Sequence, residues 1–255
     1  ASIDHLDRYV EFLASPDGTP LSGGGFFGSA LVDRVDRSRI PEAVRRTVEA
    51  GTWNVPTLSL IEHIASSESA EEMIRWPEMK YMPQNILQHW VNSKQNFDAR
   101  PDFQPDATRQ LIALRHELLK ALHDEGAPIA LGSDAPQWFN VPGFSLHREM
   151  KMMVDAGLTP YQVLATGTRN PALYFDEAGQ FGIIAKGARA DLMLLRSNPL
   201  EEITHISDQA GVMVRGEWCP REEIQSRLDR ISRWAANSVP CPPSEWQDRP
   251  CFRDF

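Results

Sequence analysis

The stretch PIALGSDAPQWF, residues 128–139, decides the predicted fold. Its first half is a run of small and branched apolar residues, which predicts a short buried strand. The run ends on a carboxylate, Asp134, between Ser133 and Ala135. Ligand sites of α/β proteins lie where strands of a parallel sheet end. The position of Asp134 therefore makes it the first candidate site residue.

Helices and strands are expected to alternate before this stretch. Residues 39–51 predict a helix, and residues 52–61 predict a strand in which Pro56 marks an edge, a bulge or the end. Residues 62–106 are broken by prolines and predict an extended connection with short helices, a kind of segment that often forms a lid. Residues 106–126 carry a leucine stripe at helical spacing. This alternation favours a parallel sheet with covering helices.

After the stretch, residues 145–157 predict one more helix. The tetrapeptide TPYQ, residues 159–162, has the pattern of a capping box, and Asn170 with Pro171 gives a second helix-start signal. Residues 181–219 have short apolar runs split by glycines, which predicts a small β unit. A helix is expected from residue 221, followed by a coil rich in proline.

These changes of texture divide the chain into three predicted parts. Residues 1–178 are expected to form the main α/β domain, residues 179–219 the β unit, and residues 220–255 the terminal helix and tail.

The composition excludes several classes of protein. The chain of 255 residues is 42% hydrophobic, which is enough to bury a core, and its formal net charge is −9. That acidic balance argues against nucleic acid or an anionic membrane surface as the main partner. There is no apolar run near the roughly 20 residues that a membrane span needs. Three cysteines make no disulfide framework; Cys241 and Cys251 could close a short loop or stay free.

Two residues could carry chemistry. Asp134 could cap the following loop through backbone N–H groups, or it could bind a metal and take a proton from water. His5 follows the short run ASID, so it also falls where a strand should end. It could be a satisfied structural histidine, but together with a carboxylate it suits zinc and similar divalent ions.

Other side chains are weaker candidates for contacting a substrate. His63 flanks the long connection and could reach the site from a lid, whereas His147 could bond a substrate or orient the loop of Asp134. Trp138 and its aromatic neighbours could line an entrance or pack the loop against the rest of the fold.

Three segments together resemble the closing half of the amidohydrolase superfamily, and most of all its imidazolonepropionase-like and Xaa-Pro-dipeptidase-like members. The segments are PIALGSDAP, PGFSLHREMKMMVDAGLTPYQVLATGTRNPALYF and FGIIAKGARADLMLLRSNPL. In order and spacing, ASIDHL, EAGTWNVPTLSL and ALGSD resemble the sixth, seventh and eighth barrel strands. The resemblance covers about residues 1 to 218. It implies a (β/α)8 barrel of the TIM type, with part of a small β-sandwich after it.

The resemblance also implies roles for the two candidates. His5 matches a ligand of one metal, and Asp134 matches a ligand of the other metal that also acts as the base toward water. The implied reaction is hydrolysis of a C–N bond in an amide, a cyclic amide or an Xaa-Pro peptide. Zinc is the first expectation for the one or two ions, with manganese, iron or cobalt as alternatives. His63 and Tyr81 are expected to shape the pocket.

The departure from the family pattern is as informative as the match. Members carry an H-x-H on the first strand, and this sequence contains none. The resemblance starts at the sixth strand, so we expect a partner chain or further segment to carry strands 1 to 5 and most of the ligands. The alternatives are a truncated remnant that serves as a non-catalytic binding module, or one half of a split enzyme. A homo-oligomer is also open.

Overall fold

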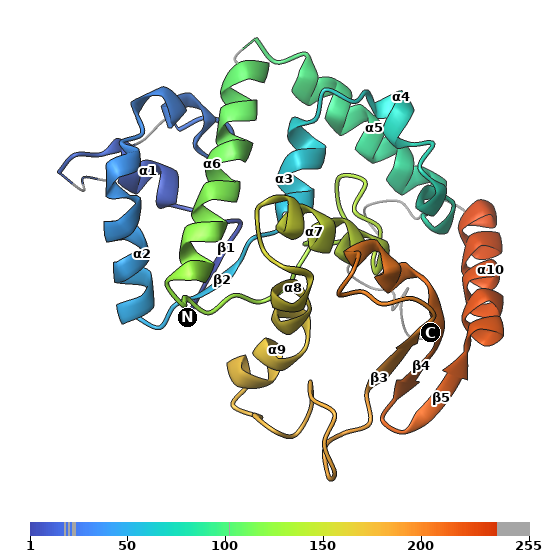
Figure 1. Cartoon of the computed structure of the whole chain (residues 1–255). Helices are drawn as coiled ribbons and strands as arrows, with labels where there is room; N and C mark the ends of the chain where they lie inside the picture. Colours follow the sequence, from blue (N-terminus) through green and yellow to red (C-terminus); the bar gives the residue numbers. More distant parts are fainter. Residues whose placement is uncertain (18, 20, 22–23, 102, 239–255) are drawn as a thin grey trace, which may run out of the picture.

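The computed structural model describes residues 1–17, 19, 21, 24–101 and 103–238. They form an α/β structure that is rich in helices (Figure 1). The strands are β1 (Ser2–Asp4), β2 (Trp53–Val55), β3 (Leu192–Leu195), β4 (Gln209–Val214) and β5 (Glu217–Pro220). The α-helices are α1 (Tyr9–Ala14), α2 (Ile40–Glu49), α3 (Leu58–Ala65), α4 (Ala70–Met73), α5 (Gln84–Asp98), α6 (Pro105–Asp124), α7 (Phe144–Asp155), α8 (Pro160–Gly167), α9 (Arg169–Tyr174) and α10 (Arg221–Asn237). Short 3-10 helices are η1 (Phe26–Arg34), η2 (Arg37–Arg39), η3 (Pro77–Tyr81) and η4 (Ile203–Ser207).

Three parallel segments lie side by side at the heart of the first part. β1 pairs in parallel with β2, and Asn54 of β2 also forms a parallel bridge with Ile129. The Asn54 N–H donates to the carbonyl of Pro128, and its carbonyl accepts from the N–H of Ala130, each at 2.9 Å. The parallel pairing and the βα alternation are therefore confirmed. The third segment forms this single bridge, although the sequence predicts a longer strand there.

The predicted leucine stripe builds the core against which these segments lie. Leu111, Leu114, Leu118 and Leu122 of α6 are all fully buried, in one hydrophobic cluster that also includes residues of α1, α2 and η1. They recur at three- and four-residue spacing, so they fall on one face of the helix. The helix predicted over residues 106–126 is confirmed as α6, and the one over residues 39–51 as α2.

Of the three roles left open for Pro56, the end of the strand is confirmed, and a strand over residues 58–61 is wrong. β2 ends at Val55, and residues 58–65 form α3. Pro56 has no N–H to continue a ladder, and Thr57 has a left-handed φ of 46°, so the chain turns sharply there. The apolar run that follows is buried in the helix, and such a run does not distinguish a helix from a strand by its pattern.

The connection over residues 62–106 is more regular than predicted. It contains α5, a helix of 15 residues, in addition to the short α4 and η3. Leu87 and Trp90 of α5 pack in a separate hydrophobic cluster with Phe139 and Val141. This connection therefore covers the loop that follows Asp134.

The two helix-start signals after the stretch have different outcomes. The capping box at Thr159 is confirmed, because Thr159 and Gln162 exchange their side-chain and backbone hydrogen bonds. Asn170 does not cap α9, which begins at Arg169. Its side chain instead donates a hydrogen bond of 2.7 Å to the carbonyl of Ile129. Asn170 thus anchors the third parallel segment to α9.

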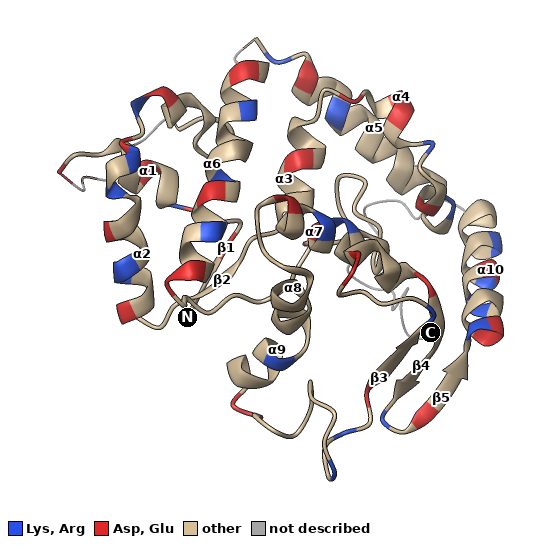
Figure 2. Ribbon diagram, viewed as in Figure 1, with Lys and Arg blue, Asp and Glu red and all other residues tan. Residues whose placement is uncertain are grey.

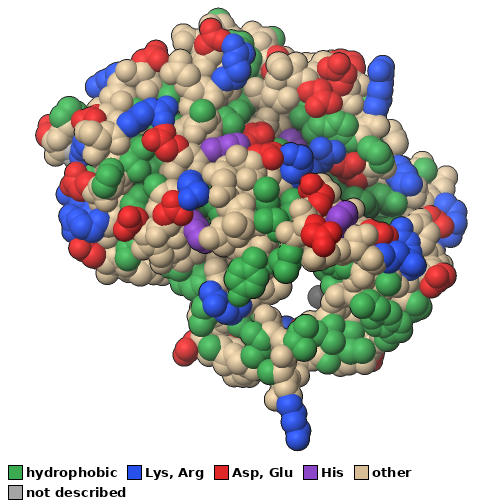
Figure 3. Space-filling view, viewed as in Figure 1, with side chains coloured by type: hydrophobic (Ala, Val, Ile, Leu, Met, Phe, Trp, Pro, Cys, Tyr) green, Lys and Arg blue, Asp and Glu red, His purple; other side chains and the backbone are tan. Residues whose placement is uncertain are grey.

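The predicted β unit is a three-stranded antiparallel sheet in the order β3-β4-β5. Large apolar side chains stand exposed on it, and Figure 3 shows apolar atoms gathered in the region of this sheet and α9. They are Leu192, Met193, Leu194, Val214 and Trp218, with Leu173, Tyr174 and Phe175 at the end of α9. α10 follows as predicted, and Cys219 carries a free thiol. Cys241 and Cys251 lie outside the described residues.

Charged side chains of both signs alternate along the outer helices, as α10 illustrates in Figure 2. Acidic and basic side chains therefore lie close together on the surface of such a helix. Among the described residues, no helix is both long enough and apolar enough to cross a membrane.

Candidate active site

His5 lies directly at the end of β1, as the sequence predicts. Its backbone N–H donates to the carbonyl of Val55 at 2.9 Å, and its φ of 59° turns the chain out of the strand. The imidazole is about one fifth exposed, with 21% of the side chain accessible. The ring of Phe27 meets it edge-on, with the centroids 5.7 Å apart.

Asp134 lies beside His5. Its Oδ2 is 3.6 Å from His5 Nε2, and 43% of its side chain is exposed. Gln137 donates from Nε2 to the same Oδ2 at 2.6 Å. A residue after β1 and a residue after the third parallel segment thus meet at the carboxyl ends of parallel strands.

The backbone around Asp134 is held from two sides. The Ser133 and Ser145 hydroxyls, both buried, are 2.7 Å apart, so α7 anchors the residue that precedes Asp134. The buried amide of Asn140 donates to the Ser133 carbonyl at 2.9 Å. Asp134 itself has φ of 53°, a left-handed conformation that aspartate tolerates better than most residues.

The residues present fit a divalent cation in part. An imidazole nitrogen and a carboxylate oxygen are donors of the kind that zinc takes, and His5 Nδ1 is already hydrogen-bonded to Thr57 Oγ1 at 2.6 Å. Second bonds of this kind orient histidine ligands in metal sites. Within the described part of the chain, no three His, Cys, Asp or Glu residues come together in a way that could hold an ion. His5 and Asp134 therefore provide two donors where a metal site generally uses three or four from the protein.

Glu149 of α7, close to the start of α3, has a fully buried carboxyl group. Glu149 of α7 accepts hydrogen bonds from the backbone N–H groups of Leu58 at 2.9 Å and Ser59 at 2.7 Å, in the first turn of α3. Burial raises the pKa of Glu149 to about 7, while these two N–H groups act in the opposite direction.

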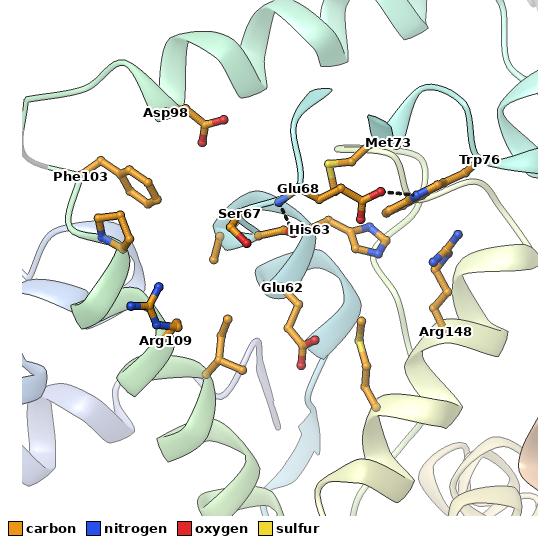
Figure 4. A pocket seen from close by; sticks show the side chains of 15 residues that line it. Glu62, His63, Ser67, Glu68, Met73, Trp76, Asp98, Phe103, Arg109 and Arg148 are labelled. Atoms are coloured by element: carbon orange, nitrogen blue, oxygen red, sulfur yellow. Dashed lines mark hydrogen bonds between the residues drawn. The ribbon is translucent and has the colours of Figure 1, made fainter. Parts of the chain in front are cut away.

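His63 lies in a different place. It lines a pocket of about 510 Å³ between α3, α4, α6 and α7, together with Trp76, Phe103, Arg109 and Arg148 (Figure 4). Neither ring nitrogen of His63 has a hydrogen-bond partner of normal geometry within the part of the chain that the structure describes. Burial, together with the charge of the nearby Arg148, lowers the pKa of His63 to about 3. His63 is therefore a neutral imidazole at physiological pH.

Arg148 fixes one wall of this pocket. Its guanidinium donates twice to Glu78 Oε1, at 2.9 Å and 2.6 Å, and lies over the Trp76 ring at 3.8 Å from the centroid. The indole N–H of Trp76 donates to Glu68 at 2.8 Å. The Trp76 ring on this wall is therefore held between the Arg148 guanidinium and the Glu68 carboxylate, and Arg148 is in turn paired with Glu78.

The other predicted substrate contacts pack against neighbouring helices. Tyr81 of η3 stacks on Phe144, with the centroids 5.0 Å apart, and Trp138 meets Phe97 of α5 edge-on at 6.1 Å. His147 is half-buried on α7, and burial lowers its pKa while Glu78 acts against this shift. Their roles toward a substrate stay predictions.

Several residues around the site were not found from the sequence. Thr57 and Phe27 contact His5 from distant positions, Glu149 contacts the helix turn that follows Thr57, and no local motif marks any of them. Gln137 could have been found, since a polar side chain three residues after Asp134 can reach back to it.

Comparison with known proteins places this geometry in a family. The chain matches the model of the Amidohydrolase family over residues 26–219, a range that includes Asp134 but not His5. Bottromycin amidohydrolase has a similar structure, with a TM-score of 0.62 and 19% identity over 92% of this chain and 48% of that chain. A crystal structure of a Xaa-Pro dipeptidase with bound methionine has a TM-score of 0.51 and 22% identity over 86% of this chain and 39% of that chain.

These similarities to solved structures concern the fold alone, because the identities are low. The chain spans less than half the length of the two solved structures. No curated protein sequence matches it. The family match, which covers most of the chain, confirms the superfamily expected from the sequence. This chain belongs to the amidohydrolase family.

Proposed function

We propose that this chain carries the closing part of a metal-dependent amidohydrolase that cleaves a C–N bond in an amide, a cyclic amide or an Xaa-Pro dipeptide. The observation that carries the proposal is the 3.6 Å approach of His5 Nε2 to Asp134 Oδ2. The family implies a TIM-type barrel, whose active sites lie at the carboxyl ends of the strands. In the proposal, β1, β2 and the segment at Ile129 are barrel strands six, seven and eight.

His5 Nε2 and the Asp134 carboxylate are the ligands that this chain offers to one or two divalent ions. Zinc fits this donor pair best, and manganese, iron or cobalt accept the same donors. Such an ion, when bound, supplies a Lewis acid and lowers the pKa of water. The remaining ligands come from the polypeptide that carries strands 1 to 5.

Asp134 is the proposed catalytic base. Its carboxylate takes a proton from the attacking water and passes that proton to the leaving nitrogen. Gln137 holds Oδ2 through the 2.6 Å hydrogen bond and so fixes how the carboxylate is turned. The partial exposure of Asp134 leaves room for water and substrate to approach it.

His63, Tyr81, Trp138 and His147 are the proposed substrate-binding residues. The pocket at His63 has a volume typical of sites for small molecules. A neutral imidazole there offers one donor and one acceptor, which suits an amide or a dipeptide backbone. The fold shared with an Xaa-Pro dipeptidase supports a dipeptide as the first substrate class to test.

Further polypeptide is proposed to complete the enzyme, either as a segment of a longer chain or as a partner chain. Among the described residues, β1 has a strand partner only in β2, and a barrel cannot close from three strands. The exposed apolar side chains of β3, β4 and α9 support a covering segment, since patches of this kind mark contact surfaces. A homo-oligomer is the alternative that covers the same face.

Metal content and hydrolysis test this proposal. The purified protein, combined with a polypeptide that carries the H-x-H strand and supplied with zinc or manganese, is expected to retain metal on desalting and to hydrolyse Xaa-Pro dipeptides or N-acyl amino acids. The variant Asp134→Asn should lose hydrolysis, whereas His89→Gln, an exposed histidine on α5, should not change it. Absence of both metal and hydrolysis, also after addition of a polypeptide that carries the H-x-H strand, contradicts the proposal.

A further inference from the structure

Helix α7 supports a neighbour of Asp134 and a neighbour of Thr57, the residue that bonds to His5. The Ser145 hydroxyl bonds to the hydroxyl of Ser133, which precedes Asp134, and Glu149 bonds to the first turn of α3, which follows Thr57. Ser145 and Glu149 are four residues apart, so they lie on the same face of the helix. Both side chains are buried. One helix face thus supports the end of the third parallel segment and the turn after β2.

The hydroxyl of Thr57, which precedes α3, does not cap that helix. Threonine before the first turn of a helix ordinarily caps the free N–H groups there. Thr57 makes no such bond to α3. Its Oγ1 instead donates to the Pro56 carbonyl at 2.8 Å and lies 2.6 Å from His5 Nδ1.

The two contacts of the Thr57 hydroxyl indicate which nitrogen of His5 carries the proton. A hydroxyl has a single hydrogen, and the Pro56 carbonyl, 2.8 Å from Oγ1, can only accept it. With that hydrogen given to Pro56, the Thr57 oxygen is left to accept from His5, which places the proton on Nδ1. Nε2 then has a free lone pair, and this is the nitrogen that faces Asp134.

Glu149 takes over the cap that Thr57 does not provide. Its two carboxylate oxygens accept from Leu58 and Ser59, which are the first two residues of α3. Thr57 is β-branched and has a left-handed φ of 46°, a conformation that needs support from its surroundings. The bonds from Glu149 hold the two residues that follow Thr57 and so provide this support.

We propose that Thr57 is a positioning residue that keeps His5 in the Nδ1–H tautomer, with Nε2 directed at a divalent cation, and that Glu149 holds Thr57 in place by capping α3. The identity of the cation rests on the proposed function. The tautomer of His5 and the cap on α3 are independent of the proposed function.

Nitrogen-15 NMR of the histidine rings in the metal-free protein, at about pH 8 where an ordinary imidazole is neutral, tests the tautomer directly. The protonated Nδ1 and the unprotonated Nε2 of His5 should give separate shifts in the wild type. Thr57→Val, which keeps the shape and loses the acceptor, should shift His5 toward the Nε2–H form. Thr57→Ser should restore the wild-type spectrum. An Nε2–H tautomer in the wild type overturns the proposal without any variant.

Zinc affinity provides the second measurement. Thr57→Val is expected to weaken zinc binding about 10- to 100-fold, as loss of a second bond to a histidine ligand does, and Thr57→Ser is expected to weaken it little. Equal zinc affinity in the wild type and Thr57→Val overturns the positioning role. A tautomer change in a protein that binds no zinc, also when the polypeptide with the H-x-H strand is present, supports the positioning and contradicts the metal in the proposed function, so the two failures are distinguishable.

The cap is tested by amide hydrogen exchange. Glu149→Gln keeps one acceptor oxygen of the two and is expected to speed exchange at Leu58 and Ser59, and to mix the His5 tautomers. Glu222→Gln, on the exposed first turn of α10, is the matched control and should change neither. Unchanged exchange at Leu58 and Ser59 overturns the role of Glu149.

Discussion

Glu149 Oε2 accepts a hydrogen bond of 2.7 Å from the backbone N–H of Ser59, although the two residues lie 90 positions apart in the sequence. The side chain is fully buried, and burial raises its pKa from the ordinary 4.5 to about 7. A carboxyl group in this position makes the stability of the fold depend on pH.

The direction of this dependence follows from proton binding. Between pH 4.5 and about 7 the folded protein holds a proton on Glu149 that the unfolded protein has released. The contribution is fully present below pH 4.5 and is lost as the pH rises through 7, with a size on the order of 3 kcal/mol. Urea unfolding at a series of pH values should show Glu149→Gln with a flatter profile than the wild type in this window. If the free energy of unfolding depends on pH equally in the wild type and in Glu149→Gln, the raised pKa of Glu149 is contradicted.

His63 makes the stability of the fold change with pH in the direction opposite to Glu149. Its pKa falls from 6.5 to about 3 on folding, so the unfolded protein binds the additional proton. The stability it contributes is present above pH 6.5 and is lost as the pH falls toward 3, by at most about 5 kcal/mol. His63→Gln should remove this acid loss in the same unfolding experiment, whereas the exposed His89→Gln should keep it. An unchanged acid limb in His63→Gln would mean that His63 is charged in the folded protein.

Gly132 permits the close approach of two parallel segments beside the site. A Cβ at this position would lie 2.6 Å from Cγ1 of Val55, which is closer than packed carbon atoms come. Gly132→Ala is expected to destabilise the protein by about 1–3 kcal/mol, a usual cost of overpacking. The double variant with Val55→Ala should recover part of that loss, because the opposing methyl group is removed. If the double variant instead loses the sum of the two single losses in thermal unfolding, residues 132 and 55 do not clash, and the two segments move apart at little cost.

Leu118 tests the core around α6. It is fully buried in the main hydrophobic cluster, so Leu118→Ala should cost about 2–5 kcal/mol in the free energy of unfolding. The control on the same helix is Glu117→Ala, which removes an exposed ion pair with Arg37 and should cost about 1 kcal/mol or less. Comparable losses in the two variants, measured by urea unfolding, would argue against α6 as the centre of the core.

The parts of the fold that were predicted correctly rest on local signals. The leucine spacing of α6, the Pro41 start and Gly51 stop of α2 and the capping box at Thr159 each act within a few residues. Helices of this kind are determined by neighbouring residues, so a single sequence is enough. The run at residues 58–61 misled the prediction because a buried apolar run satisfies a strand and a helix equally.

Some features of the candidate site could also be predicted from local sequence, and others depend on contacts between distant residues. The positions of His5 and Asp134 after short apolar segments, and the resemblance to the amidohydrolases, could be predicted from the sequence, because both are properties of consecutive residues. The approach of the two side chains to 3.6 Å, the contact of Thr57 with His5 Nδ1 and the cap that Glu149 provides to α3 depend on tertiary packing. These contacts join residues 52 to 129 positions apart, and they form only when the parallel segments and α7 pack together.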